Sequence, residues 1–73
     1  MTIYRFPSYS TVETALTRGG VYNGFYNGSR FKIRLIASGV FMSELYNTII
    51  TRLSLCDIMD DTKKLIDNIQ KGL

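Results

Sequence analysis

The sequence predicts an α+β fold in which a small three-stranded antiparallel sheet carries helices on one face, with elements in the order β-α-β-β-α-α. A run rich in aromatic and β-branched residues is centred on Asn27-Gly28, a residue pair that tight hairpin turns prefer. Two later segments, 41–53 and 55–71, carry apolar residues at helical spacing. Because the 73 residues contain no Ser/Gly-rich linker and no repeat, we expect a single domain spanning residues 1–73.

The first two expected elements are a short strand and a short helix. Residues 2–6 should form a strand that ends at Pro7, because proline has no N–H to donate to a sheet. Ser10 and Glu13 have the spacing of a capping box, which places a helix start at Ser10. Gly19-Gly20 supplies the left-handed residue at which many helices end, so this helix should span about two turns.

A hairpin is expected over residues 20–36, with its two-residue turn at Asn27-Gly28. That turn fixes the register, from Tyr26 opposite Ser29 to Val21 opposite Arg34. A turn at Asn23-Gly24 is the alternative, and it ranks lower because it leaves a second turn signal inside the return strand. One face of the favoured hairpin is apolar and should be core: Tyr22, Tyr26, Phe31, Ile33 and Leu35. The other face should be wet and basic: Val21, Asn23, Phe25, Arg30, Lys32 and Arg34.

The rest of the chain is expected to form two helices on the apolar face. In the segment 41–53 the apolar residues recur at helical spacing: Phe41, Met42, Leu45, Tyr46, Ile49 and Leu53. Ser54 and Asp57 form a second capping signature, and Lys71 with Gly72 marks the end of a final helix over 55–71. On a helix, the adjacent Ile49 and Ile50 would point about 100° apart, so we expect one of them, or Val40-Phe41, to meet a second copy of the chain.

Composition excludes several kinds of catalytic site. The chain has no His and one Cys, so triads that use His as the base, His-ligated zinc sites, intramolecular disulfides and Cys-cluster metal sites are all excluded. No nucleophile lies near a suitable base in the sequence. We therefore expect a protein that is not an enzyme and that carries no cofactor.

The basic hairpin face is the candidate binding site, with Phe25, Arg30, Lys32 and Arg34 as its partner-binding residues. Alternate residues of a strand stand about 7 Å apart, close to the phosphate spacing of an extended single strand. Phe25 lies beside Arg30 and is placed to stack a base. Three interpretations stay open: an ordinary solvated face, a surface for an acidic protein patch, and a surface for single-stranded nucleic acid. A net charge of only +3 favours the first two.

Two further groups invite a chemical interpretation but have simpler explanations. Asp57, Asp60 and Asp61 have the helical spacing of a hard-cation site, yet acidic residues are favoured near a helix N-terminus without any metal. We therefore expect no metal there. Cys56 is expected to be a small buried hydrophobic residue rather than an activated thiol.

Size and composition also set expectations for assembly, compartment and role. A hydrophobic core this small gives only marginal stability unless a disulfide, a metal or self-association adds to it. We therefore regard a monomer and a homodimer as equally open. The single Cys and the lack of a signal peptide or membrane span predict a cytoplasmic protein with no membrane partner, in the host cytoplasm if the gene is viral. Such chains are common among phage and mobile-element genes. We expect a small non-enzymatic regulator or inhibitor that occupies a site on a larger protein or complex, with a nucleic-acid-binding module as the alternative.

Overall fold

A computed structural model describes residues 5–37 and 39–72 of the chain. Two helices flank four strands in the order α-β-β-β-β-α, so the expected three-stranded sheet in the order β-α-β-β-α-α is wrong. The elements are α1 (Tyr9–Gly19), β1 (Val21–Tyr26), β2 (Ser29–Ala37), β3 (Val40–Leu45), β4 (Thr48–Arg52) and α2 (Leu55–Lys71). The strands form one antiparallel sheet in the order β1-β2-β3-β4, each paired with its neighbour in sequence.

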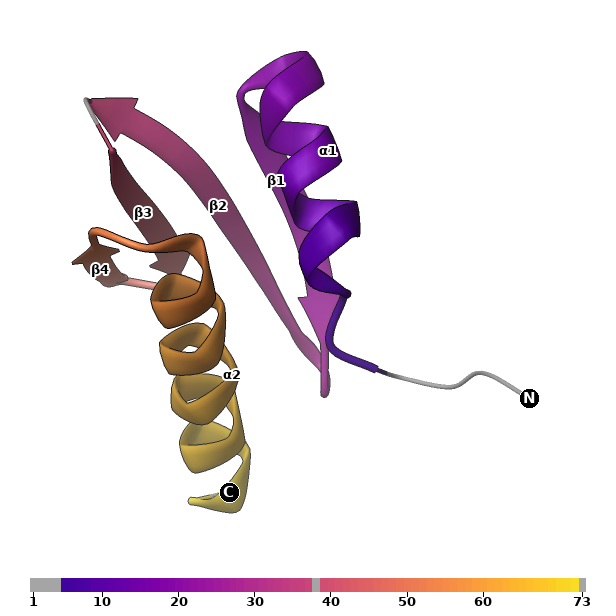
Figure 1. Cartoon of the computed structure of the whole chain (residues 1–73). Helices are drawn as coiled ribbons and strands as arrows, with labels where there is room; N and C mark the ends of the chain where they lie inside the picture. The colour runs from indigo at the N-terminus through magenta and orange to yellow at the C-terminus, as the bar shows by residue number, and fades with distance from the viewer. Residues whose placement is uncertain (1–4, 38, 73) are drawn as a thin grey trace.

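The two helices lie on the same face of this sheet. α1 packs against β1 and β2, and α2 packs against β3 and β4 (Figure 1). Alternate side chains of the strands therefore enter a shared core with both helices. Buried hydrophobic residues of that core are Val12, Phe31, Ile33, Leu45, Leu55, Ile58, Met59 and Ile66. The opposite face of the sheet has no helix over it among the described residues.

The segment before α1 differs from the sequence prediction. Residues 2–4 of the expected strand lie outside the described residues, and Arg5 and Phe6 have no regular secondary structure. Phe6 instead packs its ring on Phe31, with centroids 5.3 Å apart and planes 8° apart. The helix begins two residues earlier than expected, because Ser8 rather than Ser10 is the N-cap and accepts a hydrogen bond from the Thr11 N–H at 3.3 Å.

The end of α1 is as predicted. Gly20 adopts a left-handed conformation with φ of 76° and donates its N–H to the Leu16 carbonyl at 2.9 Å. That geometry turns the chain directly into β1, so α1 folds back over the strand that follows it (Figure 1).

The β1–β2 hairpin has the predicted register at every pair, from Tyr26 opposite Ser29 to Val21 opposite Arg34. Asn27 and Gly28 have φ of 49° and 81°, as a type I′ turn requires. Phe31 and Ile33 are buried as expected. Leu35 is on the same face but is 50% exposed, so its predicted place in the core is wrong; it lies at the rim of a groove that the helices do not cover.

The predicted helix over 41–53 is instead the β3–β4 hairpin. Tyr46 and Asn47 form its two-residue loop, with Tyr46 at φ of 54°. Leu45 pairs with Thr48 next to the loop, and Ser43 pairs with Ile50. The strand alternation was hidden because Ser43, a polar residue, faces the core, so the inward positions of β3 do not read as a continuous apolar set.

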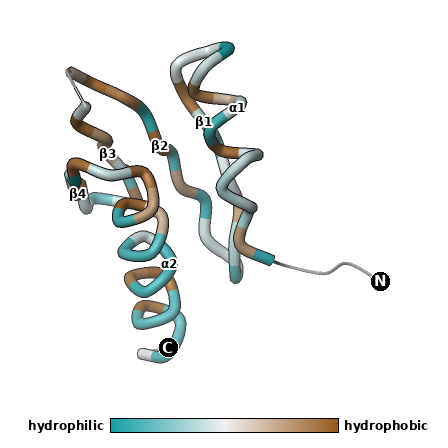
Figure 2. Tube along the Cα trace, in the orientation of Figure 1, coloured by the Kyte–Doolittle hydropathy of each residue, from teal (hydrophilic) through white to brown (hydrophobic). Residues whose placement is uncertain are grey.

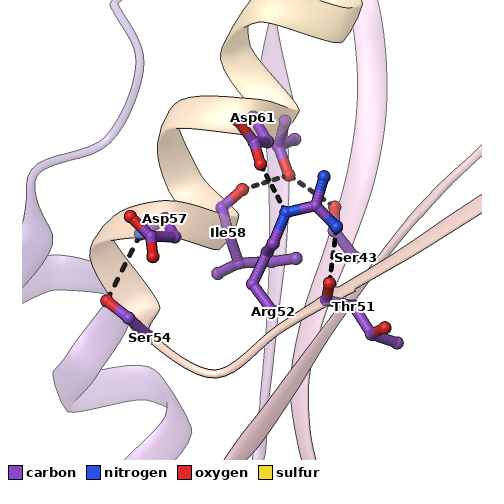
Figure 3. Close-up of polar contacts among 8 residues, drawn as sticks. Ser43, Thr51, Arg52, Ser54, Asp57, Ile58 and Asp61 are labelled. Atoms are coloured by element: carbon purple, nitrogen blue, oxygen red, sulfur yellow. Dashed lines mark hydrogen bonds and ion pairs between the residues drawn. The ribbon is translucent and has the colours of Figure 1, made fainter.

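The final helix α2 is confirmed over the predicted range. Ser54 caps it by accepting a hydrogen bond from the Asp57 N–H at 3.4 Å, as Figure 3 shows. Its apolar stripe faces the sheet, and hydrophilic residues follow its outer side (Figure 2). Cys56, expected to be buried, is exposed near the start of this helix.

Candidate functional site: the open face of the sheet

The candidate site is the face of the sheet that neither helix covers, here called the open face. Strand pairing aligns its side chains in rows across the sheet. One row holds Val21, Arg34, Met42 and Thr51, the next holds Asn23, Lys32, Glu44 and Ile49, and a third holds Phe25 and Arg30. The open face is defined by these ten residues.

All four sequence-predicted binding residues lie on the open face. Arg30, Lys32 and Arg34 are alternate residues of β2, and Phe25 on β1 is the direct partner of Arg30. Phe25 is 50% exposed, Arg30 is exposed, and Lys32 and Arg34 are half-buried. The strand therefore presents three basic groups in a line about 7 Å apart, with one aromatic ring at its end.

The charge of this line is partly balanced by Glu44 on β3. Glu44 pairs across the strands with Lys32, and its carboxylate lies 4.0 Å from the Arg34 Nε. Both side chains of the Glu44–Arg34 pair are about two-fifths exposed, so solvent screening keeps the contribution of this ion pair to stability small. Among the described residues the buried Nε atom of Arg34 has no hydrogen-bond partner, because the Glu44 carboxylate at 4.0 Å is too far away to accept one. Three positive charges and one negative charge give the open face a net charge of +2.

Arg30 and Lys32 differ from Arg34 in their electrostatic surroundings. Within residues 5–37 and 39–72, neither of them forms a salt bridge or a side-chain hydrogen bond. Together with Asn23, Glu44 and Tyr46 they border a shallow hollow on the open face. These two cations are therefore the groups best placed to meet an acidic partner.

The apolar part of the open face was missed by sequence reasoning. Ile49 is 63% exposed and sits in the same row as Lys32 and Glu44, while Met42 sits beside Arg34. Leu53, just after β4, is 80% exposed. Ile49 and Met42 were assigned to a helix because 41–53 matches helical spacing, although the β-branched run Thr48 to Thr51 is itself a strand signal.

The other candidate groups do not assemble into a catalytic or metal centre. Among the described residues, no three His, Cys, Asp or Glu side chains are close enough to hold a metal ion. Asp61 is instead bonded to Arg52, with 2.5 Å between the Oδ2 and Nε atoms. A groove of about 170 Å³ lies between α1 and the start of α2, and Tyr9 and Glu13 line it. The Glu13 carboxylate and, to a smaller extent, burial and Cys56 raise the pKa of Tyr9 above its ordinary value.

No family model, curated protein or solved structure matches this chain. Neither helix in the described part of the chain has both the length and the apolar character needed to span a membrane.

Proposed function

We propose that this protein is a non-enzymatic binding protein whose open face occupies an acidic patch on a larger protein and so regulates or inhibits it. The observation that carries the proposal is that Arg30 and Lys32, which form no salt bridge within the described residues, share one uncovered face with the exposed apolar side chains Phe25 and Ile49. Aromatic and Arg side chains are enriched at protein interfaces, with polar groups around them.

The sheet holds these groups ready for binding. Arg30 and Lys32 project from the second strand of a four-stranded sheet that both helices support from behind. Side chains on a rigid strand lose less freedom on binding than side chains on a loop, so less of the contact energy is spent on ordering them. The positive charge of the face also steers an acidic partner toward it.

Nucleic acid is a weaker match for the same surface. Glu44 lies directly opposite Lys32, where it interrupts the continuous positive track that a phosphate backbone follows. Non-specific single-strand binders combine a positive groove with several stacking aromatic rings, whereas Phe25 is the one aromatic residue among the ten that define the open face, and Tyr46 borders its hollow. Met42 and Ile49 offer nothing to a phosphate backbone but are suited to an apolar protein surface.

The test compares two double variants with the same loss of charge. Arg30→Ala/Lys32→Ala removes the two cations from the open face, and Arg5→Ala/Arg18→Ala removes two exposed cations outside the sheet. Each chain is immobilised, exposed to cell lysate with and without nuclease, and its bound proteins are identified and titrated. We expect a nuclease-resistant partner whose affinity falls by at least about tenfold for the open-face variant and stays unchanged for the control.

Three results would contradict the proposal. One is equal capture by both variants, and another is loss of the captured protein after nuclease treatment. The third is direct binding of a labelled single-stranded oligonucleotide with a log–log salt slope of about −2, the value for release of counterions from about three phosphates. A slope of that size would show that the open face binds nucleic acid rather than an acidic protein.

A further inference from the structure

The edge of the sheet at β4 carries a second interaction surface, formed by outward backbone groups of β4 rather than by the side chains of the open face. In the described chain β4 pairs only with β3, so one side of its backbone faces outward. In a hairpin with a two-residue loop, the residues that flank the loop form a hydrogen-bonded pair, and such pairs then alternate along the strands. Leu45–Thr48 flanks the loop, so Thr48 and Ile50 bond to β3, while the N–H and C=O groups of Ile49 and Thr51 point to the outer edge.

This edge has few of the features that keep sheets from pairing. It contains no Pro, no Lys and no bulge, and its sequence TIITR is dominated by β-branched residues. The one charged residue, Arg52, is already held by Asp61, as Figure 3 shows. Arg52 also donates to the outward Thr51 carbonyl at 2.6 Å, but a carbonyl oxygen has a second lone pair that can accept another N–H.

We propose that a second copy of this chain pairs with β4 in antiparallel orientation and extends the sheet to eight strands. A two-fold axis at Ile50 places Ile49 opposite Thr51 of the partner subunit and Thr51 opposite the partner subunit's Ile49. All four residues then use their outward N–H and C=O groups, and Ile50 meets its own copy on the helix-covered face.

The position of α2 fits the same axis. α2 packs on both β3 and β4, and strands are about 4.8 Å apart, so the helix axis lies about 5 Å from the proposed two-fold. The two copies of α2 would then run antiparallel about 10 Å apart, which is the separation of directly packed helices. Ile50, Lys64 and Leu65 line one hollow beside β4, so the axis at Ile50 reaches α2 near its middle.

The charges of α2 are arranged for that antiparallel contact. One stripe of the helix, at spacings of four and three, carries Asp57, Asp61, Lys64, Asn68 and Lys71. Its first half is acidic and its second half is basic. An antiparallel copy centred near Lys64 brings Asp57 opposite Lys71 of the partner subunit, and the same pair recurs on the other side of the axis, so two opposite-charge pairs flank one contact between Lys64 and the partner's Lys64. This charge complementarity identifies a second copy, rather than an unrelated strand, as the occupant of the edge.

The test measures the mass of the full chain by sedimentation equilibrium from about 1 to 100 µM, together with backbone amide exchange. We expect a dimer at the upper concentrations, with the outward amides of Ile49 and Thr51 protected as strongly as those of Thr48 and Ile50. Thr51→Pro removes an outward N–H without removing a bond to β3, and its circular dichroism reports whether the fold is kept. This variant should sediment as a monomer.

A second test of the dimer reverses charges on α2 and does not depend on the proline variant. Asp57→Lys and Lys71→Glu each place like charges opposite one another in a homodimer, so each should weaken dimerisation at least about fivefold. Mixing the two variants restores both opposite-charge pairs, and the mixed dimer should form as tightly as the wild type. Glu13→Lys, the same charge change on α1, is the control that should leave the dimer intact.

A wild-type chain that stays monomeric at about 100 µM would overturn the proposal, and so would a mixture that dimerises no better than its components. Neither result bears on binding through Arg30 and Lys32, because these two residues lie on β2, away from the β4 edge.

Discussion

Gly24 is the residue whose missing side chain shapes the helix-covered face at β1. A Cβ built there would lie 2.6 Å from the ring of Tyr22 and closer still to the ring of Phe31. The space allows Phe31 to lie across the strand, with its centroid 6.0 Å from that of Tyr22 and stacked on Phe6. Glycine in a strand is ordinarily a weak choice, and here close packing of the aromatic rings explains it.

The variant Gly24→Ala should therefore destabilise the fold, against the usual trend. Alanine in a strand normally gains about 0.5–1 kcal/mol over glycine, but forcing a methyl group into packed rings costs about 1–3 kcal/mol. We expect a net loss of about 1–2 kcal/mol, measured as a lower urea midpoint with an unchanged slope. Gly19→Ala is the matched control, because nothing lies within 4 Å of a Cβ built at that helical position. That control should be neutral or more stable, and equal behaviour of the two variants would contradict the packing explanation.

At the scale of elements, one buried polar contact fixes α2 on the sheet. Thr62 and Ser43 are 0% and 1% exposed, and their hydroxyl oxygens lie 2.7 Å apart (Figure 3 draws this contact). Thr62 Oγ1 donates to the Ser43 Oγ and also lies 2.6 Å from the Ile58 carbonyl oxygen, so its one proton is shared between two acceptors. The buried Ser43 oxygen therefore depends on Thr62 for its hydrogen bond.

This arrangement predicts non-additive variants. Thr62→Val keeps the shape of the side chain but leaves the Ser43 hydroxyl buried without a partner, which should cost about 1–3 kcal/mol. Adding Ser43→Ala removes the stranded hydroxyl, so the double variant should be less destabilised than the sum of the single variants by at least about 0.5 kcal/mol. Chemical denaturation of the wild type, the two single variants and the double variant gives the coupling free energy between the two hydroxyl groups. Simple additivity would show that the two hydroxyls do not act as a pair.

The two hairpins show which elements can be predicted from sequence. The first could be predicted in full because its information is local: Asn27-Gly28 accepts positive φ and thereby sets every pair of the register. The second has Tyr46-Asn47 as its loop, a much weaker turn signal, and the polar Ser43 inside. Ser43 is understood only once Thr62, nineteen residues later, is packed against it. For residues 41–53, the choice between helix and strand therefore depends on tertiary contacts such as the one between Ser43 and Thr62.

Only the part of the candidate site that lies on the first hairpin could be predicted from the sequence. Phe25, Arg30, Lys32 and Arg34 follow from the register of the first hairpin alone. The acidic and apolar residues that surround them come from β3 and β4, so they were missed with those strands. The prediction that Ile49 and Ile50 lie about 100° apart on a helix is wrong, because they are successive residues of β4 and so face opposite sides of the sheet.

At the scale of the whole molecule, the two ends of the helix-covered side are closed differently. At the end with the hairpin loops, Tyr26 donates to Asp67 at 3.0 Å, and Gln70 donates to Ser29, which also bonds to the Tyr46 hydroxyl. These bonds join α2 to both hairpins near their loops. At the other end an apolar groove lined by Leu35 and Phe41 stays open. The polar bonds thus hold the last turns of α2 to the sheet together with the packing of Ile66 and Ile69 on the core.

Asp67 makes this polar closure sensitive to acid. Partial desolvation raises the pKa of Asp67, but hydrogen bonds from Tyr26, Lys63 and Asn27 and the charge of Lys63 outweigh it, so the pKa lies below its ordinary value of 3.8. A pKa lowered by folding contributes stability that is fully present above the unfolded value, about pH 4, and is lost as the pH falls through the folded value. Asp67→Asn should therefore be less stable than the wild type at pH 7, and the difference should shrink below about pH 4.

Urea denaturation from about pH 2 to 7 measures this difference for each chain. Asp60→Asn is the control, because Asp60 is exposed and makes no hydrogen bond or ion pair within the described residues. The Asp60 variant should follow the pH profile of the wild type, since it leaves the contacts of Asp67 in place. A gap between the wild type and Asp67→Asn that stays constant into acid, or widens there, would show that the carboxylate charge does not hold α2 to the hairpin. The protonated, uncharged carboxyl group of Asp67 would then be sufficient for that contact.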